Sequence, residues 1–219
     1  MSVRKLSASL ASSKTSSTPG AYLVGFGSAY ATSVAIPTHQ AGDIIIIYAR
    51  AGGNNVGTTA PAAGGTVPTW TQIVQGGASG FGISRLYSCV ATTGSHTSGT
   101  FTNASGMTVA VVRRASGIGA FAGLQQVNAS PWFAPAVTLT KSNNTSVLLQ
   151  FFGWGDLVNA APTTFSAGPQ GYTQRFMSRT ATVALGLITK NITDCAPAAN
   201  ITAAANIYAS HITVEVLAS

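Results

Sequence analysis

Large hydrophobic residues occupy every second position over several stretches of the chain, which is the pattern of a β-strand with one buried face. Over residues 22–36 small residues near Gly25 interrupt this alternation, which predicts a bend or a bulge in the strand. Over residues 207–217 apolar side chains alternate with others, among them His211 and Glu215, that we expect to face outward. The pattern therefore predicts strands at both ends of the regular part of the chain.

A run rich in β-branched residues over 44–50 has no polar face, so we expect that strand to be covered on both sides. A long loop rich in Gly, Ala, Asn and Pro follows over about residues 51–68. No amphipathic helix of useful length is visible, and the Ala-rich residues 198–205 are the one weak helical candidate. The other strand-like segments are residues 70–75, 81–91, 107–114, 136–140, 147–154, 172–178 and 181–189.

The second half of the chain repeats the order of segments found in the first half. In each half a short apolar segment and a polar turn lead into an apolar run, which begins at Ile44 and at Val147. Each run is followed, after a loop, by an aromatic-Thr-Gln motif, which begins at Trp70 and at Tyr172. The two runs start 103 residues apart and the two motifs 102 residues apart. A duplicated set of strands favours a closed all-β scaffold over an enzyme built around one cleft.

About ten strands in two similar sets predict one all-β domain over residues 21–219. We expect a jelly-roll-like β-sandwich built from two weakly similar halves, about residues 21–120 and 121–219. Two small domains in sequence are less favoured, because no linker separates the halves.

Residues 1–20 are interpreted as an extended N-terminal arm, since they are small, polar and without clear periodicity. Such a segment is disordered when alone, so we expect a neighbouring molecule to hold it in an assembly. Its positive residues Arg4, Lys5 and Lys14 are possible contacts to a partner protein with an acidic surface.

Charged residues make up only 7% of the chain, against about 25% in typical soluble domains. The surface must then be largely uncharged, which suits a protein that packs against neighbours, and we expect a homo-oligomer with a trimer as the favoured arrangement. The net charge is +7, but outside the arm the positive residues cluster only at Arg113 and Arg114. A nucleic-acid groove needs a dense basic stripe with aromatic residues, so nucleic acid is not an expected partner.

No apolar stretch is long enough to span a bilayer, and residues 1–20 lack the apolar segment of a signal peptide. We therefore expect neither a membrane partner nor secretion, and the several Asn-x-Ser/Thr triplets are interpreted as accidents of composition. Cys89 and Cys195 lie in opposite halves, and we expect two buried free thiols rather than a disulfide framework.

Residues that perform catalysis are scarce. The acidic residues number only four, and the three histidines His39, His96 and His211 are isolated in the sequence. General acid–base work needs paired titratable groups, and a metal needs clustered ligands, so we expect no enzyme, no metal and no cofactor. Neither a nucleophile elbow nor a phosphate-binding glycine loop is present.

One segment combines an aromatic residue with a carboxylate, which is a combination that can bind a sugar. Trp154 and Asp156 stand together in a Gly-rich segment that ends a predicted strand. Aromatic rings stack on sugars and carboxylates accept hydrogen bonds from their hydroxyl groups, and loops carry many binding sites. Core packing of Trp154 and a turn role for Asp156 are the favoured alternatives.

Several segments together resemble β-sandwich proteins of tailed-bacteriophage virions, which are tail-associated or capsid-decorating components. The resemblance rests on Ala41–Tyr48, Pro68–Ile73, Arg85–Ala91 and Met107–Arg113, and it recurs weakly over residues 137–217. It implies a structural virion component located in the phage particle, with other virion proteins as partners. No functional residues are carried over with it, and it does not choose between head and tail.

The first hypothesis is therefore a non-enzymatic structural subunit of a phage particle, attached to the capsid or tail through subunit contacts and its N-terminal arm. The alternative is a glycan- or receptor-binding module at the tail tip. Its site would be formed by the loops over residues 51–68, 92–100 and 155–171, with Trp154 and Asp156 as contacts.

Overall fold

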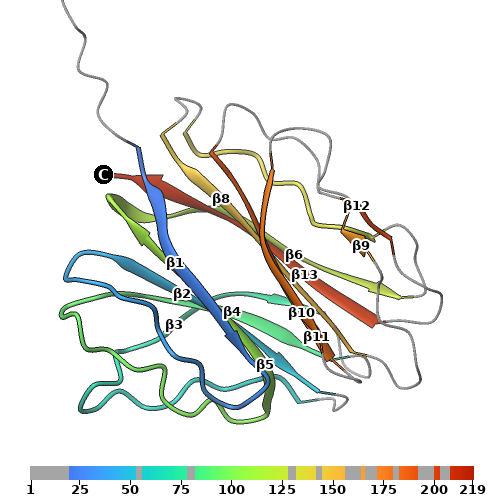
Figure 1. Ribbon diagram of the computed structural model, residues 1–219, viewed down its shortest axis with the longest axis horizontal. Helices are drawn as coiled ribbons and strands as arrows, with labels where there is room; N and C mark the ends of the chain where they lie inside the picture. Colours follow the sequence, from blue (N-terminus) through green and yellow to red (C-terminus); the bar gives the residue numbers. More distant parts are fainter. Residues whose placement is uncertain are drawn as a thin grey trace, which may run out of the picture.

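The described part of the chain consists of strands and loops without a helix (Figure 1). This structure is a computed structural model, and it describes residues 20–52, 56–77, 82–127, 132–141, 145–155, 164–165, 172–179, 183–191, 200–202 and 208–219. The predicted all-β class is confirmed. The predicted N-terminal arm over residues 1–20 lies outside the described residues, except for Gly20.

Two five-stranded antiparallel sheets and one small sheet organise these strands. Sheet 1 has the order β1-β5-β2-β4-β3 and is formed by β1 (Tyr22–Ala29), β2 (Ile44–Ala51), β3 (Thr71–Gly76), β4 (Ser84–Val90) and β5 (Ala104–Arg113). Sheet 2 has the order β6-β13-β8-β11-β10 and is formed by β6 (Ala115–Val127), β8 (Val147–Gly155), β10 (Thr173–Arg179), β11 (Val183–Asn191) and β13 (Tyr208–Ala218). The small sheet has the order β7-β12-β9 and is formed by β7 (Trp132–Phe133), β9 (Thr164–Phe165) and β12 (Asn200–Thr202).

The two large sheets have the same topology. Counting the strands of sheet 2 in chain order gives the sequence first, fifth, second, fourth, third across the sheet, which is the order in sheet 1. The registers agree as well, because Ile47 lies opposite Val109 in sheet 1 and Gln150 lies opposite Thr213 in sheet 2. The β-sandwich built from two similar halves is therefore confirmed. Its winding differs from a jelly roll with interleaved Greek keys, since each sheet is made by one contiguous half.

The inner core lies between the two sheets. Alternate residues of β2 and of β8 point into it, so that Tyr48 stacks on Phe151 with 5.8 Å between ring centroids and 5° between ring planes. These two residues occupy equivalent positions in the two halves. Each large apolar side chain buried here contributes roughly 1.5–3 kcal/mol. The core includes Ile44, Ile46, Val112, Leu149, Leu187, Ile212 and Val214.

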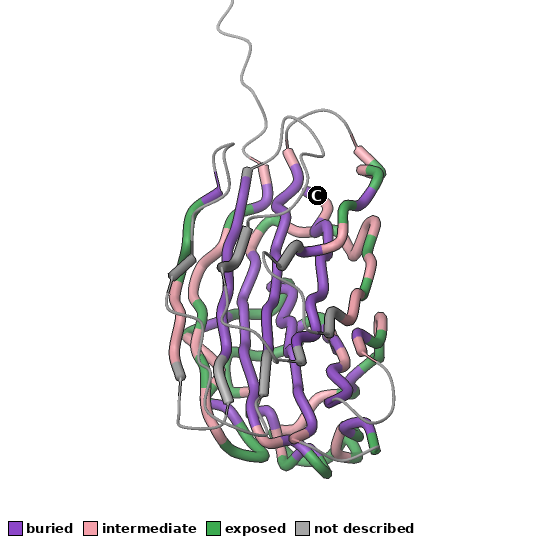
Figure 2. The backbone as a smooth tube through the Cα atoms, turned by 90° about the vertical axis from the view of Figure 1, so that its right-hand side faces the viewer, coloured by how far each residue is buried: buried purple, intermediate pink, exposed green. Residues whose placement is uncertain are grey.

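A second apolar cluster lies on the outer face of sheet 1, under loops. All eight residues of β2 are buried, which confirms the prediction that this strand is covered on both sides. Buried residues run along the strands in the middle of the sandwich (Figure 2). The covering loops are fastened to one another, since Trp70 Nε1 donates to the Ser98 carbonyl at 3.1 Å and the Val34 amide donates to Ser98 Oγ at 3.0 Å. The Phe101 amide donates to the Thr32 carbonyl at 2.7 Å.

Two strand boundaries differ from the sequence prediction. Strand β1 has the predicted bulge, between Leu23 and Gly25, but it ends at Ala29 rather than at Ile36. Beyond it the chain leaves the sheet, and Val34 packs on the outer cluster, so its alternation reflects loop packing. The predicted strand over residues 136–140 is wrong, because the chain is irregular there.

Strand β6 is the longest strand of the described chain, and the sequence did not predict it. Its Gly and Ala content is unfavourable for a strand. The structure explains the glycine at position 123, because a Cβ there would lie 2.9 Å from the carbonyl carbon of Gln75 and 3.1 Å from Gly76 Cα. Along this side the edge strand β3 of sheet 1 therefore packs directly on the edge strand β6 of sheet 2.

Candidate functional site

The root of the N-terminal arm is held at one end of the sandwich. The Ala21 amide donates to the Thr145 carbonyl at 2.8 Å, and a Cβ on Gly20 would lie 2.6 Å from that carbonyl oxygen. Ala21 is buried in the inner core. Gly20 and Ala21, just before β1 of sheet 1, therefore contact the residue that precedes β8 of sheet 2, and residues 1–19 are joined to the sandwich at this fixed point. We call this end of the sandwich the arm end.

An ion pair at the arm end uses one of the few carboxylates. Arg113 donates from Nε to Asp43 Oδ1 at 2.9 Å and from Nη2 to Oδ2 at 2.8 Å. The Gln40 amide also donates to Asp43 Oδ2, at 2.9 Å. The hydrogen bonds from Arg113 hold the pKa of Asp43 below its usual value, despite the opposing effect of burial. Asp43 is thus a turn carboxylate that is neutralised inside the protein.

Arg114 forms the corner where the chain passes from sheet 1 to sheet 2. Its φ of 55° lies in the left-handed region, which costs a residue with a side chain of order 1 kcal/mol. The Ser219 amide holds the corner by donating to the Arg114 carbonyl at 3.0 Å. The Arg114 guanidinium lies over the exposed Tyr22 ring, 5.6 Å from its centroid. The corner therefore presents a cation and an aromatic ring beside the arm root.

The second described carboxylate, Glu215, is also used internally. It accepts hydrogen bonds from the Ala120, Thr140 and Lys141 amides at 3.1, 2.7 and 3.2 Å. Burial would raise the pKa of Glu215, but these three amides outweigh it and keep the pKa below its usual value. Neither Asp43 nor Glu215 is exposed, so within the described residues the side-chain charge that reaches the surface is positive.

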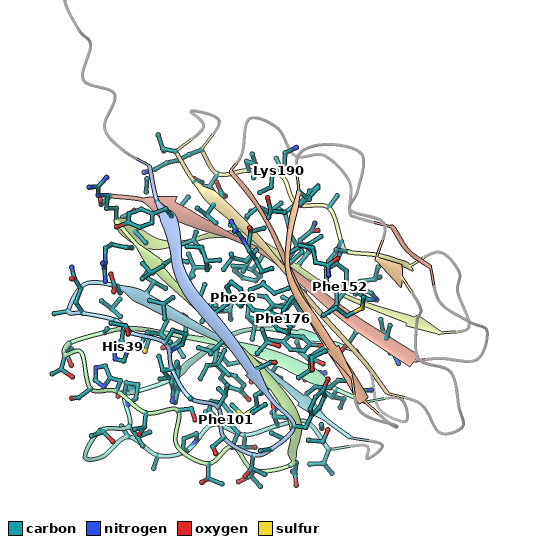
Figure 3. The ribbon with its side chains drawn as sticks, in the orientation of Figure 1. Phe26, His39, Phe101, Phe152, Phe176 and Lys190 are labelled. Atoms are coloured by element: carbon teal, nitrogen blue, oxygen red, sulfur yellow. The ribbon has the colours of Figure 1, made fainter. Side chains whose placement is uncertain are left out.

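Two histidines that are isolated in the sequence meet in the loops over sheet 1. The ring of His39, labelled in Figure 3, stacks on that of His96 with 5.9 Å between centroids and 7° between planes. The His96 amide donates to His39 Nε2 at 3.0 Å, and the Thr92 amide donates to His96 Nε2 at 3.0 Å. Both rings therefore carry their proton on Nδ1, which donates to the carbonyls of Pro37 and Thr66. No sequence signal indicated this pair, because its members are far apart along the chain.

A groove with a volume of about 510 Å³ lies beside this pair. It runs between two extended segments, Ser33–Ile36 and His96–Thr100. Its lining is partly polar and partly apolar, and the hydrogen bond between Thr66 Oγ1 and Thr97 Oγ1 at 2.9 Å holds two of the loops that frame it. Two loops of the alternative hypothesis, residues 51–68 and 92–100, thus meet over sheet 1.

The outer face of sheet 2 carries buried polar residues. Among them is His211, which lies on the outward side of β13 as predicted but is fully buried. His211 packs edge-on against Phe152 with 5.0 Å between centroids, and burial lowers its pKa to about 3. Nearby in the register, Thr213 Oγ1 and both amide atoms of Gln150 are buried and have no hydrogen-bond partner among the described residues. Sequence reasoning missed this set, since a strand residue opposite the core face is ordinarily exposed.

A network of hydroxyl groups joins the two sheets inside the core. Ser84 Oγ donates to Tyr48 Oη at 2.7 Å, and Tyr48 Oη donates to the Ser210 carbonyl at 3.0 Å. Burial raises the pKa of Tyr48, so its hydroxyl is neutral and acts as a structural donor. Arg50 is buried beside it, and its Nε and Nη1 have no hydrogen-bond partner in the described part of the chain. A Cβ on the facing Gly153 would lie 2.8 Å from Arg50 Cδ, so this position needs glycine.

The structure places few of the candidate residues of the sequence. The backbone of Trp154 lies in β8, opposite Ala184 and Ala209, but its side chain is outside the described residues. Asp156 lies outside them as well, as do Arg4, Lys5 and Lys14 of the arm.

Cys89 is a buried free thiol, as predicted, and burial raises its pKa to about 12. Cys195 lies outside the described residues. Among the described side chains no group of three or more His, Cys, Asp or Glu is placed to hold a metal ion. Within that same part of the chain no helix has the length and apolarity to cross a membrane.

Comparisons with protein families, with curated proteins and with solved structures find no match to this chain.

Proposed function

We propose that this protein is a non-enzymatic structural subunit of a tailed-bacteriophage virion, attached to the capsid or tail through subunit contacts and its N-terminal arm. The observation that carries the proposal is the arm end. There the basic arm is joined to the sandwich next to Tyr22, whose ring lies against Arg114, while Asp43 is neutralised by Arg113. A partner with an acidic surface would meet no exposed described carboxylate side chain at this end.

The construction of the sandwich supports a mechanical role. The loops over sheet 1 are tied by side-chain and backbone hydrogen bonds, and the two sheets share one inner core and a hydroxyl network. Loops fastened in this way open at a higher free energy than free loops do. Such a unit transmits load between its neighbours without a moving part.

Exposed apolar side chains support contacts with neighbours. Phe26 is 39% exposed, and Val90, at the arm end of β4, is 61% exposed. Large apolar residues at the surface of a protein with so few charges are typical of contact surfaces. These residues are the candidates for subunit contacts in a homo-oligomer, for which a trimer remains the favoured arrangement.

The virion setting rests on the resemblance of residues 41–113 to β-sandwich virion proteins. The segments that carry the resemblance form β2, β3, β4 and β5, which together make four of the five strands of sheet 1. They are scaffold segments, so they support a structural role and leave the choice between head and tail to experiment.

Labelling intact particles tests the proposal. Antibodies against the sandwich, with immunogold detection, should mark every particle at fixed positions, and a chain lacking residues 1–19 should fold but fail to incorporate. Gly20 is kept in that variant because it packs on Thr145. Reversing the charge of Arg4, Lys5 and Lys14 to Glu should reduce incorporation, whereas changing Ser7 and Ser9 to Ala is the matched control. Unlabelled particles, or full incorporation of the truncated chain, would contradict the proposal.

A glycan- or receptor-binding module at the tail tip is the second candidate, and the groove beside His96 favours it. The test is a glycan array and a host-cell binding assay with the purified chain. Specific binding that is lost in Trp154→Ala would support this function at the residues that the sequence indicated. Binding that is lost in Thr97→Trp, which would fill the groove, and kept in Trp154→Ala would assign the site to the groove instead. No binding to either target would exclude this candidate.

A further inference from the structure

One side of the sandwich is open. The edge strands β1 and β10 belong to different sheets, and no backbone hydrogen bonds join them in the described part of the chain. They meet through one aromatic pair, Phe26 and Phe176, whose rings stack with 5.8 Å between centroids and 14° between planes (Figure 3). Both edges are accessible, since Tyr22 and Phe26 on β1 and Gln174 on β10 are exposed.

The opposite side of the sandwich is closed. There β3 and β6, the equivalents of β10 and β1, approach so closely that Gly123 has no room for a Cβ. Phe121 occupies the position on β6 that Phe26 occupies on β1, since both lie opposite equivalent residues, Val214 and Ala110. All four strands are sheet edges, but β3 and β6 pack directly on each other, whereas β1 and β10 approach through the rings of Phe26 and Phe176 and leave their edges beside a partly buried apolar surface. Unpaired edges of this kind are templates for an added strand.

A segment of the arm has the composition of such a strand. The arm as a whole lacks periodicity, but residues 6–13 carry no charge and match β1 in length, with eight residues. Within them Leu6, Ala8 and Leu10 occupy alternate positions, separated by Ser7 and Ser9. In an extended conformation one face would therefore be apolar and the other would be small and polar.

The arm root favours exchange between copies over a return to the same copy. The Ala21 amide bond to Thr145 directs the chain across the core, away from the free edge of its own β1. Thr18 precedes Pro19, and a residue before proline favours an extended backbone. Residues 14–19 then span up to about 20 Å, which is enough to reach a neighbouring molecule.

We propose that residues 6–13 of one copy add as a strand to the free edge of β1 in a second copy, where Leu6 and Leu10 cover Phe26 and Phe176. The inference rests on the proposed structural function and names the contact that joins the subunits. Main-chain hydrogen bonds to β1 supply the affinity, and the alternation of Leu and Ser fixes the register. The positive residues Arg4 and Lys5 precede the added strand and stay free for another partner.

Complementation between two defective copies tests the exchange. The first variant, Phe26→Ser, has a damaged edge and an intact arm. The second variant, Leu6→Asp with Leu10→Asp, has an intact edge and a damaged arm. By light scattering coupled to size-exclusion chromatography, the unmodified chain should be an oligomer, and each variant alone should lose its assembly down to the 22.1 kDa monomer. A mixture of the two should form a one-to-one dimer.

The matched control is Phe121→Ser, which removes the equivalent ring on the closed side and should leave the oligomer unchanged. Circular dichroism of each variant checks that the sandwich is folded, and the arm variant is safe in this respect because residues 6 and 10 precede the described sandwich. A monomeric parent chain, a mixture that stays monomeric, or equal effects of Phe26→Ser and Phe121→Ser would overturn the exchange.

The outcome can be separated from that of the proposed function. Labelled particles without arm exchange in solution would leave the virion role standing and remove this contact. Arm exchange without labelled particles would keep the contact and remove the virion role.

Discussion

The outer faces of the two sheets differ far more than their inner faces do. Facing the shared core, β2 presents Ile44, Ile46 and Tyr48, and β8 presents the equivalent Val147, Leu149 and Phe151. On the outer face β2 and β5 of sheet 1 present Ile45, Ile47, Met107, Val109 and Val111. The equivalent positions of β8 and β13 in sheet 2 hold Leu148, Gln150, His211, Thr213 and Glu215.

This contrast separates what the repeat requires from what each half adds. The inner faces bury each other, so both halves keep apolar residues there. Each outer face is covered by its own loops, so its chemistry is free to differ. Sheet 1 has an apolar outer cluster under fastened loops, whereas sheet 2 has a polar one that holds Glu215 by three backbone amides. The following substitutions exchange residues between the two faces.

The largest loss of stability should come from placing the carboxylate of sheet 2 at the equivalent position of sheet 1. Val111→Glu puts a charge at a fully buried position inside the apolar outer cluster of sheet 1. An uncompensated buried charge costs about 3–5 kcal/mol, so the variant should be close to unfolded at neutral pH. Urea denaturation followed by circular dichroism measures it, and a loss below about 1 kcal/mol would show that sheet 1 accepts a carboxylate as sheet 2 does.

The reverse exchange, Glu215→Val, should lower the stability of the fold by less than Val111→Glu does. It leaves the amides of Ala120, Thr140 and Lys141 without their acceptor. If water partly hydrates these amides, the free energy of unfolding should fall by about 2–4 kcal/mol. Glu215→Gln keeps one acceptor oxygen and should lie between the variant and the parent in the same denaturation assay. A stable Glu215→Val chain would mean that the carboxylate is not what holds these loops.

His211→Met, which introduces the residue found at position 107, should change the pH dependence. The pKa of His211 falls from 6.5 in the unfolded chain to about 3 in the folded one. The unfolded state therefore binds the extra proton between these values, and the parent loses stability as the pH falls below 6.5. At pH 5 the loss is about 2 kcal/mol. The variant should lack this part of the acid sensitivity and keep the part below pH 4 that comes from the low pKa of Asp43 and Glu215.

The smallest effect should come from Thr213→Val, which introduces the residue found at position 109. Thr213 Oγ1 is buried without a hydrogen-bond partner, so replacing it by a methyl group should stabilise the fold by about 1 kcal/mol. The reverse change Val109→Thr should destabilise by about 1–2 kcal/mol. Thermal unfolding of both variants measures the pair, and a destabilised Thr213→Val would show that the hydroxyl has a role in sheet 2.

The sequence predicted the fold well wherever its hydrophobic periodicity came from strands. The apolar run from Ile44, its repeat from Val147 and the alternation over residues 207–217 all became strands within a residue or two of their predicted bounds. Strand β6 was not predicted because its Gly and Ala content is unfavourable for a strand. The reason for Gly123 is the close approach of β3, which lies far away in the sequence. Val34 and Ile36 alternated for a different reason, since they pack as loop residues on the outer cluster.

The candidate site was harder to predict from the sequence. Arg113 was visible as part of a basic pair, but nothing local indicated that its partner is Asp43, which lies 70 residues away. The meeting of His39 with His96 and the burial of His211 likewise depend on how the loops fold over the two sheets. Contacts of this kind follow from topology, which a single sequence pattern does not contain.

The most direct test of the account is the mass of the full chain in solution compared with that of residues 20–219. The account holds that the sandwich exists to be joined to its neighbours and that the arm does the joining. It predicts an oligomer for the full chain and a folded monomer for the truncated one. A full chain that stays at 22.1 kDa at concentrations in the micromolar range and above would contradict it.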